Sequence, residues 1–241
     1  MREPRDSSRR ALITTAAMAG AGLILGGCAA DQSLRRPAEA SQAPGAEAGV
    51  SPAEDLMREH GVLRRILLVY EEAARRLDAA GELPLQVLPE SAGIVRTFIE
   101  RYHEKLEEDF LFPRFRKANT LTDLVDVLLE QHKAGRQVTD TIARLAGADA
   151  MKGPDQRPAL AGALRQFTRM YGPHAAREDT VLFPAIREVV AAGEYDDLGE
   201  EFEKMEHQLF GEDGFEKMVD RVAAIEKSLG IYDLRQFTPQ G

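Results

Sequence analysis

One phrase occurs twice in this chain, and it constrains the fold more than any other feature. Residues 103–116 read HEKLEEDFLFPRFR, and residues 174–187 read HAAREDTVLFPAIR. Aligned without a gap, both stretches place a glutamate four residues after a histidine and follow it with Leu-Phe-Pro and an arginine. In an α-helix, positions i and i+4 lie on one face, so each His and Glu point the same way. The repeat therefore predicts two similar helices that carry matched polar pairs.

A further histidine precedes each copy at a nearly equal interval. Leu-Met-Arg-Glu-His ends at His60 and is followed by Arg64, and Leu-Leu-Glu-Gln-His ends at His132 and is followed by Arg136. The chain therefore reads as two helical hairpins, each with one His on its first helix and His-x-x-x-Glu on its second. Two similar hairpins pack naturally about a pseudo-two-fold axis.

The rest of the chain fits an all-α fold. Of its 241 residues, 44% are hydrophobic, which is enough for one domain with a substantial core. A capping box, Ser51-Pro52-Ala53-Glu54, predicts a helix start. Helical periodicity then predicts helices at roughly 52–81, 89–117, 121–147, 157–192 with an interruption near Gly172-Pro173, and 196–229 with a break near 211–214. We therefore predict an antiparallel up-down four-helix bundle over 51–192, with an additional C-terminal helix and tail over 193–241 packed on it.

The beginning of the chain has the layout of an export segment. Ser8-Arg9-Arg10 resembles a twin-arginine signal and precedes an apolar run rich in small residues. The run ends in Leu25-Gly26-Gly27-Cys28, which resembles the lipobox of bacterial lipoproteins. We expect residues 1–27 to be a removed signal peptide and Cys28 to carry a lipid that anchors an exported protein to a membrane, in the periplasm or cell envelope. Residues 28–50, rich in Ala, Pro, Ser, Gln and Gly, are expected to be a flexible tether.

Charge and cysteine content narrow the function. The formal net charge is −9, which does not favour nucleic acid as a partner. Cys28 is the single cysteine, so neither an intramolecular disulfide nor a thiolate metal cluster can form.

The four histidines and two glutamates of the repeat lie on apolar helical stripes, which predicts that they are buried. His60 shares its face with Leu56 and Leu63, and His132 shares its face with Leu128. Burying imidazoles and carboxylates costs several kcal/mol unless they are paired. A metal ion removes this cost because neutral imidazole and carboxylate are its ligands. We therefore predict a dinuclear metal site in the bundle core, with the glutamates as bridges.

These motifs resemble those of the haemerythrin-like (HHE) cation-binding domain, over about residues 52–192. The resemblance rests on two His-x-x-x-Glu motifs, two further histidines and the duplicated Leu-Phe-Pro. It implies six metal ligands, with the two glutamates bridging: His60, His103, Glu107, His132, His174 and Glu178. It also implies a pair of non-haem irons and chemistry with O₂, NO or peroxide, although zinc or manganese suits the same donors.

The chain departs from oxygen-carrying members of that family at two positions. Those members carry a second histidine one turn after the His of the third helix, where this chain has Arg136. Their last acidic ligand is typically an aspartate five residues after its histidine, whereas Glu178 follows His174 by four. These departures argue against reversible oxygen carriage. They leave sensing, peroxide or NO chemistry, or iron holding.

Three further residues are candidates for an extra ligand or a supporting hydrogen bond. Glu104 reaches the site only if the helix is locally distorted; otherwise it is a solvated neighbour, as we expect for Glu108. His207 is the remaining histidine, and a surface position is the alternative for it. Tyr171 shares a face with His174 and is a candidate hydrogen-bond donor behind the ligands.

The sequence thus predicts a non-haem di-iron protein that binds or senses O₂, NO or peroxide in the cell envelope. Two alternatives remain: a protein that holds iron or zinc without gas chemistry, and a structural envelope bundle. Catalytic turnover is not decided by these residues.

Overall fold

The computed structural model describes residues 50–147 and 155–239. The expected signal peptide over 1–27, the lipid site at Cys28 and all of the tether except Val50 lie outside these ranges. Within the described residues, no helix is both long enough and apolar enough to span a membrane.

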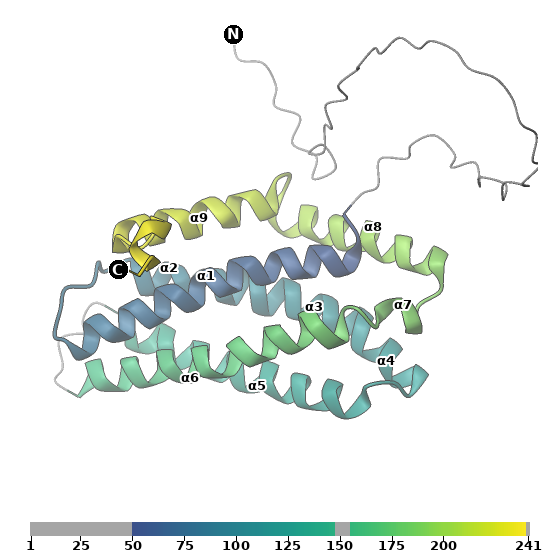
Figure 1. Ribbon diagram of the computed structural model, residues 1–241, viewed down its shortest axis with the longest axis horizontal. Coiled ribbons are helices and arrows are strands. Elements are labelled where there is room, and N and C mark those ends of the chain that lie inside the picture. The colour runs from purple at the N-terminus through teal and green to yellow at the C-terminus, as the bar shows by residue number, and fades with distance from the viewer. Residues whose placement is uncertain (1–49, 148–154, 240–241) are drawn as a thin grey trace, which may run out of the picture. The chain divides into compact units, whose positions relative to one another are not determined.

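Four helical rods form the bundle, and successive rods run in opposite directions (Figure 1). The first rod is α1 (Pro52–Asp78) and the third is α5 (Thr122–Leu145). The fourth joins α6 (Gln156–Arg177) to the π-helical η4 (Glu178–Leu182). The second rod is continuous and consists of α2 (Val87–Ile94), η1 (Val95–His103), α3 (Glu104–Leu106), η2 (Glu107–Leu111) and α4 (Phe112–Ala118). The described residues contain helices and no strand, which confirms the predicted all-α bundle.

The predicted C-terminal helix is present as two longer helices preceded and followed by short ones. These elements are α7 (Ile186–Val189), α8 (Ala192–Phe210), α9 (Gly214–Leu229) and the 3₁₀ turn η5 (Leu234–Phe237). Both α8 and α9 pack along α1 (Figure 1). The break falls where the sequence predicted it, because Gly211 adopts a positive φ of 73° that ends α8.

The helix starts and interruptions follow local chemistry. The Ser51 hydroxyl accepts a hydrogen bond from the Glu54 amide at 3.3 Å, as expected for the predicted cap. The predicted interruption near Pro173 is wrong, because α6 runs through it as far as Arg177. The helix ends instead around Pro184, where the Phe183 amide reaches back to the Glu178 carbonyl at 2.9 Å in a wider π-helical turn.

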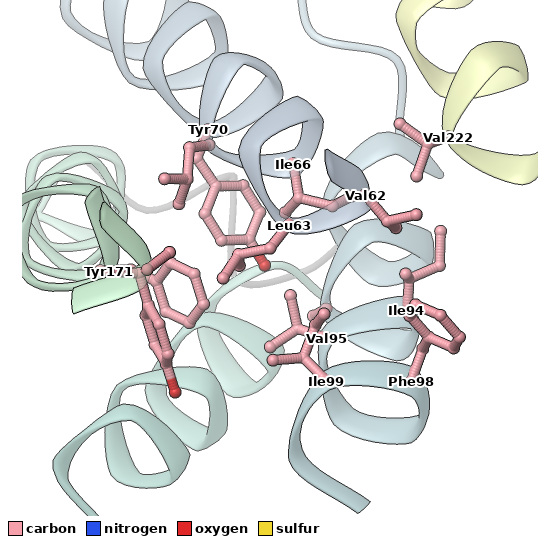
Figure 2. Packing of buried hydrophobic residues seen from close by; sticks show 14 of the residues in the cluster. Val62, Leu63, Ile66, Tyr70, Ile94, Val95, Phe98, Ile99, Tyr171 and Val222 are labelled. Carbon is pink, nitrogen blue, oxygen red and sulfur yellow. The ribbon is translucent and has the colours of Figure 1, made fainter. Parts of the chain in front are cut away.

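The hydrophobic core lies between the rods. Figure 2 shows Leu63 of α1, together with Val95 and Ile99 of η1, directed toward one central region. Each of these side chains is at most 1% exposed, and burying a side chain of this size contributes about 1.5–3 kcal/mol. Val222 of α9 is also buried and points toward Val62 of α1, so the C-terminal helices extend this core (Figure 2).

Candidate metal centre

The six predicted ligands meet inside the bundle, and every rod contributes at least one of them. His60 lies on α1, His132 lies on α5, and the second and fourth rods each supply a His-x-x-x-Glu pair. None of the six is more than 4% exposed. They form two groups in which one potential ligand atom from each residue lies within 4.8 Å of the others: His60, His103 and Glu107, and His132, His174 and Glu178. We call these the first and the second half-site.

The two carboxylates lie between the half-sites. One oxygen of Glu107 is 3.7 Å from His103 Nε2, and its other oxygen is 3.3 Å from His132 Nε2. One oxygen of Glu178 is 3.1 Å from His174 Nε2 and 3.3 Å from His60 Nε2. Each glutamate therefore faces one imidazole from each half-site.

All four imidazoles are held from behind. The Nδ1 atom of each ring lies 2.7–3.1 Å from a side-chain oxygen, in the pairs His60–Asp179, His103–Glu59, His132–Glu108 and His174–Gln131. Because a carboxylate or amide oxygen accepts a hydrogen bond, Nδ1 of each ring is the donor in these pairs. Nε2 is the ring atom that faces the two glutamates, and it offers its lone pair to a cation when the imidazole is neutral, as metal-binding histidines require.

Sequence reasoning missed these four partners. Each is the sequence neighbour of a predicted ligand: Glu59 precedes His60, Gln131 precedes His132, Glu108 follows Glu107, and Asp179 follows Glu178. A polar residue beside four of the six ligands, at matching positions of both repeats, was the available signal. The expectation that Glu108 lies on a solvated face is wrong, because its side chain is only 10% exposed and contacts His132.

Two arginines at corresponding positions of the repeat donate hydrogen bonds to carboxylates of the site. Arg64, one turn after His60, donates to Asp179, and Arg136, one turn after His132, donates to Glu108 at 2.5 Å. Arg136 stands where oxygen carriers have a second histidine. It therefore orients the Glu108 carboxylate, which lies behind the His132 imidazole.

The additional candidates have different environments. Glu104 is 1% exposed, not solvated as the simpler interpretation held, and it lies between the π-helical segments of the second rod. Its carboxylate accepts hydrogen bonds from the Tyr171 hydroxyl at 2.6 Å and from Arg136 at 2.7 Å. Tyr171 is therefore a donor behind the ligands, to Glu104. His207 is exposed on α8 and belongs to neither half-site, which favours the surface alternative.

The histidines and glutamates polarise one another strongly. Burial lowers the pKa of His60, but its hydrogen bond to Asp179 and the nearby Glu178 carboxylate outweigh burial and raise the pKa to about 9. Burial also lowers the pKa of His132, but the nearby Glu107 carboxylate and the hydrogen bond to Glu108 outweigh burial and raise the pKa to about 10. Burial, followed by the charge of His60, holds the pKa of His103 well below its usual range.

The two glutamates also have shifted pKa values. Burial and the charge of Glu178 raise the pKa of Glu107 to about 8. Burial raises the pKa of the Glu178 carboxyl, but His174 and His60 outweigh burial and hold this pKa well below its usual range. Protons shared between imidazoles and carboxylates thus balance charge in the same space that a cation would occupy.

The donors fit a divalent metal. Both oxygens of Glu107, both oxygens of Glu178 and His132 Nε2 are buried and have no hydrogen-bond partner. Leaving buried carboxylate oxygens in this state costs several kcal/mol, and coordination to a cation offsets the cost. Imidazole nitrogens and carboxylate oxygens suit iron, zinc and manganese. The fold and these donors define a metal-binding protein of the helical-bundle class.

Comparison with known proteins identifies the family. The family model described as Hemerythrin HHE cation binding domain matches residues 51–186 and, in a second alignment, residues 124–236. The chain belongs to this family. Proteins described as uncharacterized from Mycobacterium bovis and from Mycobacterium tuberculosis are 47% identical to it over 236 residues, covering 98% of this chain and 92% of theirs. No solved structure matches the chain.

Proposed function

We propose that this protein binds two non-haem irons and uses them to bind or sense O₂, NO or peroxide. The observation that carries the proposal is the position of Glu107 and Glu178, which are buried without hydrogen-bond partners between two pairs of imidazoles. In this proposal His60 and His103 would hold one ion, His132 and His174 would hold the other, and Glu107 and Glu178 would contribute to both. Iron supplies reversible electron transfer and affinity for small oxidants when it is bound.

The donor number supports a site that accepts a small ligand. Two imidazoles and two shared carboxylates give each ion four protein donors. Six-coordinate iron would therefore keep open positions. Phe112 stacks on His132 with ring centres 5.5 Å apart, and Phe183 stacks on His60 at 5.4 Å. These phenyl rings cover the imidazoles. We infer that they admit only small molecules to the site and restrict the entry of water.

The test is the metal content and visible spectrum of the purified protein. We expect two irons per chain and a charge-transfer absorption that changes when azide, nitric oxide or peroxide is added. A colourless protein with stoichiometric zinc would support a metal-holding function without gas chemistry. A protein that takes up no metal would leave only a structural bundle.

We further propose that the protein is exported and anchored in the cell envelope through a lipid on Cys28. The arginine pair before an apolar run and the Leu-Gly-Gly-Cys sequence support this location. We expect Cys28→Ala to abolish incorporation of a labelled fatty acid and to move the protein out of the membrane fraction. Ser33→Ala, a change in the neighbouring segment, is the control and should leave labelling unchanged. Equal labelling of the parent and Cys28→Ala would refute the anchor.

A further inference from the structure

The two half-sites have equivalent hydrogen bonds at one imidazole and different hydrogen-bond partners at the other. The repeat relates His60 with Asp179 to His132 with Glu108, and in both pairs a carboxylate lies behind the ring. The corresponding arginines contact these carboxylates in the same way. The remaining pairs differ in kind: His103 contacts the Glu59 carboxylate at 2.8 Å, whereas His174 contacts the Gln131 amide oxygen at 2.9 Å.

This difference changes the imidazole as a ligand. A carboxylate that accepts the Nδ1 hydrogen increases the basicity of Nε2 and stabilises the positive charge that a bound cation brings. A neutral amide oxygen orients the ring but supplies no such charge. We therefore expect Glu59 to make His103 a better ligand for a cation than His174 is.

The charge around Glu59 increases the asymmetry. Glu59 is grouped with Asp55 and Glu206, and these three carboxylates are 0%, 7% and 2% exposed. The residue of the second repeat that corresponds to Asp55 is Val127, which is apolar and exposed. Three buried carboxyl groups thus lie together beside the first half-site, where the second repeat has an apolar residue.

One carboxylate near the second half-site, Glu104, acts in the opposite direction. Ala175 occupies the matching position of the other repeat, so Glu104 has no counterpart. Its two oxygens accept hydrogen bonds from Tyr171 and from the Arg136 guanidinium, and the arginine offsets its charge. Glu104 therefore adds less negative charge to the second half-site than a buried carboxylate without an arginine would, and it does not make up for the neutral Gln131.

We propose that the two half-sites bind cations with unequal affinity, and that the first half-site, with Glu59 behind His103, fills first. Glu59 and Gln131 are positioning residues that set this order through the imidazoles they contact. The inference rests on the proposed metal function, and it adds an order of filling that the ligand set alone does not contain.

The experiment is a Co²⁺ titration of the metal-free full-length chain, followed by visible absorption with a competing chelator. We expect two resolved steps for the parent protein. Glu59→Gln should weaken the tighter step by roughly 10–100-fold and leave the weaker step in place. Gln131→Glu should strengthen the weaker step by a similar factor and leave the tighter one in place.

The controls separate this inference from the metal site itself. Glu130→Gln changes the same chemical group on an exposed position of α5 and should move neither step. If each substitution shifts both steps equally, the difference in affinity between the steps arises from repulsion between the two cations, and the inference is wrong. If the parent binds no Co²⁺, the proposed function fails, and the inference fails with it. Both substitutions are nearly isosteric, and circular dichroism checks that each variant folds.

Discussion

The double substitution Glu107→Gln and Glu178→Gln is expected to abolish binding of both metal ions while leaving the metal-free protein folded. These carboxylates have no hydrogen-bond partners and face both half-sites, so their charge is the main source of attraction for a cation there. Without a cation, burial raises the pKa of Glu107 to about 8, so an amide of equal size replaces a largely neutral group there. His174 and His60 keep Glu178 ionised, so its replacement should cost some stability but not the fold.

Thermal unfolding with and without added metal measures both effects. A ligand present at one hundred times its dissociation constant stabilises the folded state by about 2.7 kcal/mol. The parent should show a gain of at least this order with excess Fe²⁺ or Zn²⁺, and the double variant should show none. Glu130→Gln, one residue from Gln131 but exposed, should behave as the parent does. Full metal occupancy in the double variant would contradict the assignment of these residues as bridges.

Gly135→Ala is expected to destabilise the protein by about 1–3 kcal/mol through overpacking. Gly135 lies in the middle of α5, where glycine costs about 1 kcal/mol relative to alanine. The expected loss of stability is therefore opposite to the gain that helix propensity alone predicts. A Cβ at this position would lie 2.1 Å from the Tyr171 hydroxyl oxygen and 2.7 Å from the ring carbon that bears it. Tyr171 is 1% exposed and its hydroxyl is bound to Glu104, so the ring cannot move aside without breaking that contact.

Gly162→Ala supplies the matched control. Gly162 is also inside a long helix, α6, but a Cβ there would meet nothing within 4 Å. We expect it to stabilise the protein by about 0.5–1 kcal/mol, in line with propensity. Urea denaturation of both variants measures the two changes. If Gly135→Ala is as stable as the parent, the hydroxyl of Tyr171 does not occupy the space over this glycine.

Much of the fold and the position of the six candidate ligands could be predicted from the sequence. The duplicated His-x-x-x-Glu and the two preceding histidines repeat at nearly equal intervals, and such a repeat allows few arrangements of helices. Apolar residues at helical spacing then indicated which face of each helix is buried. The location of the site in the bundle core followed from these two patterns together.

The residues behind the ligands could not be predicted in the same way. Glu104 and Glu108 lie on the second rod, which passes from π-helical to α-helical and back to π-helical turns between Val95 and Leu111. A wider turn changes which residues share a face, so α-helical periodicity placed both glutamates toward solvent. The prediction at Pro173 failed for a similar reason, because α6 continues through the proline and the π-helical η4 extends the fourth rod as far as Leu182.

The burial of all six donors on four separate rods has a consequence for exchange kinetics. An ion coordinated by side chains that are at most 4% exposed would be shielded from a chelator in the solvent. We expect it to leave when neighbouring rods separate, so the rate of metal loss should follow local opening of the bundle and not the intrinsic lability of the ion. Metal retention would then report how tightly the hairpins are closed against each other, and a binding partner that loosens one hairpin would accelerate release.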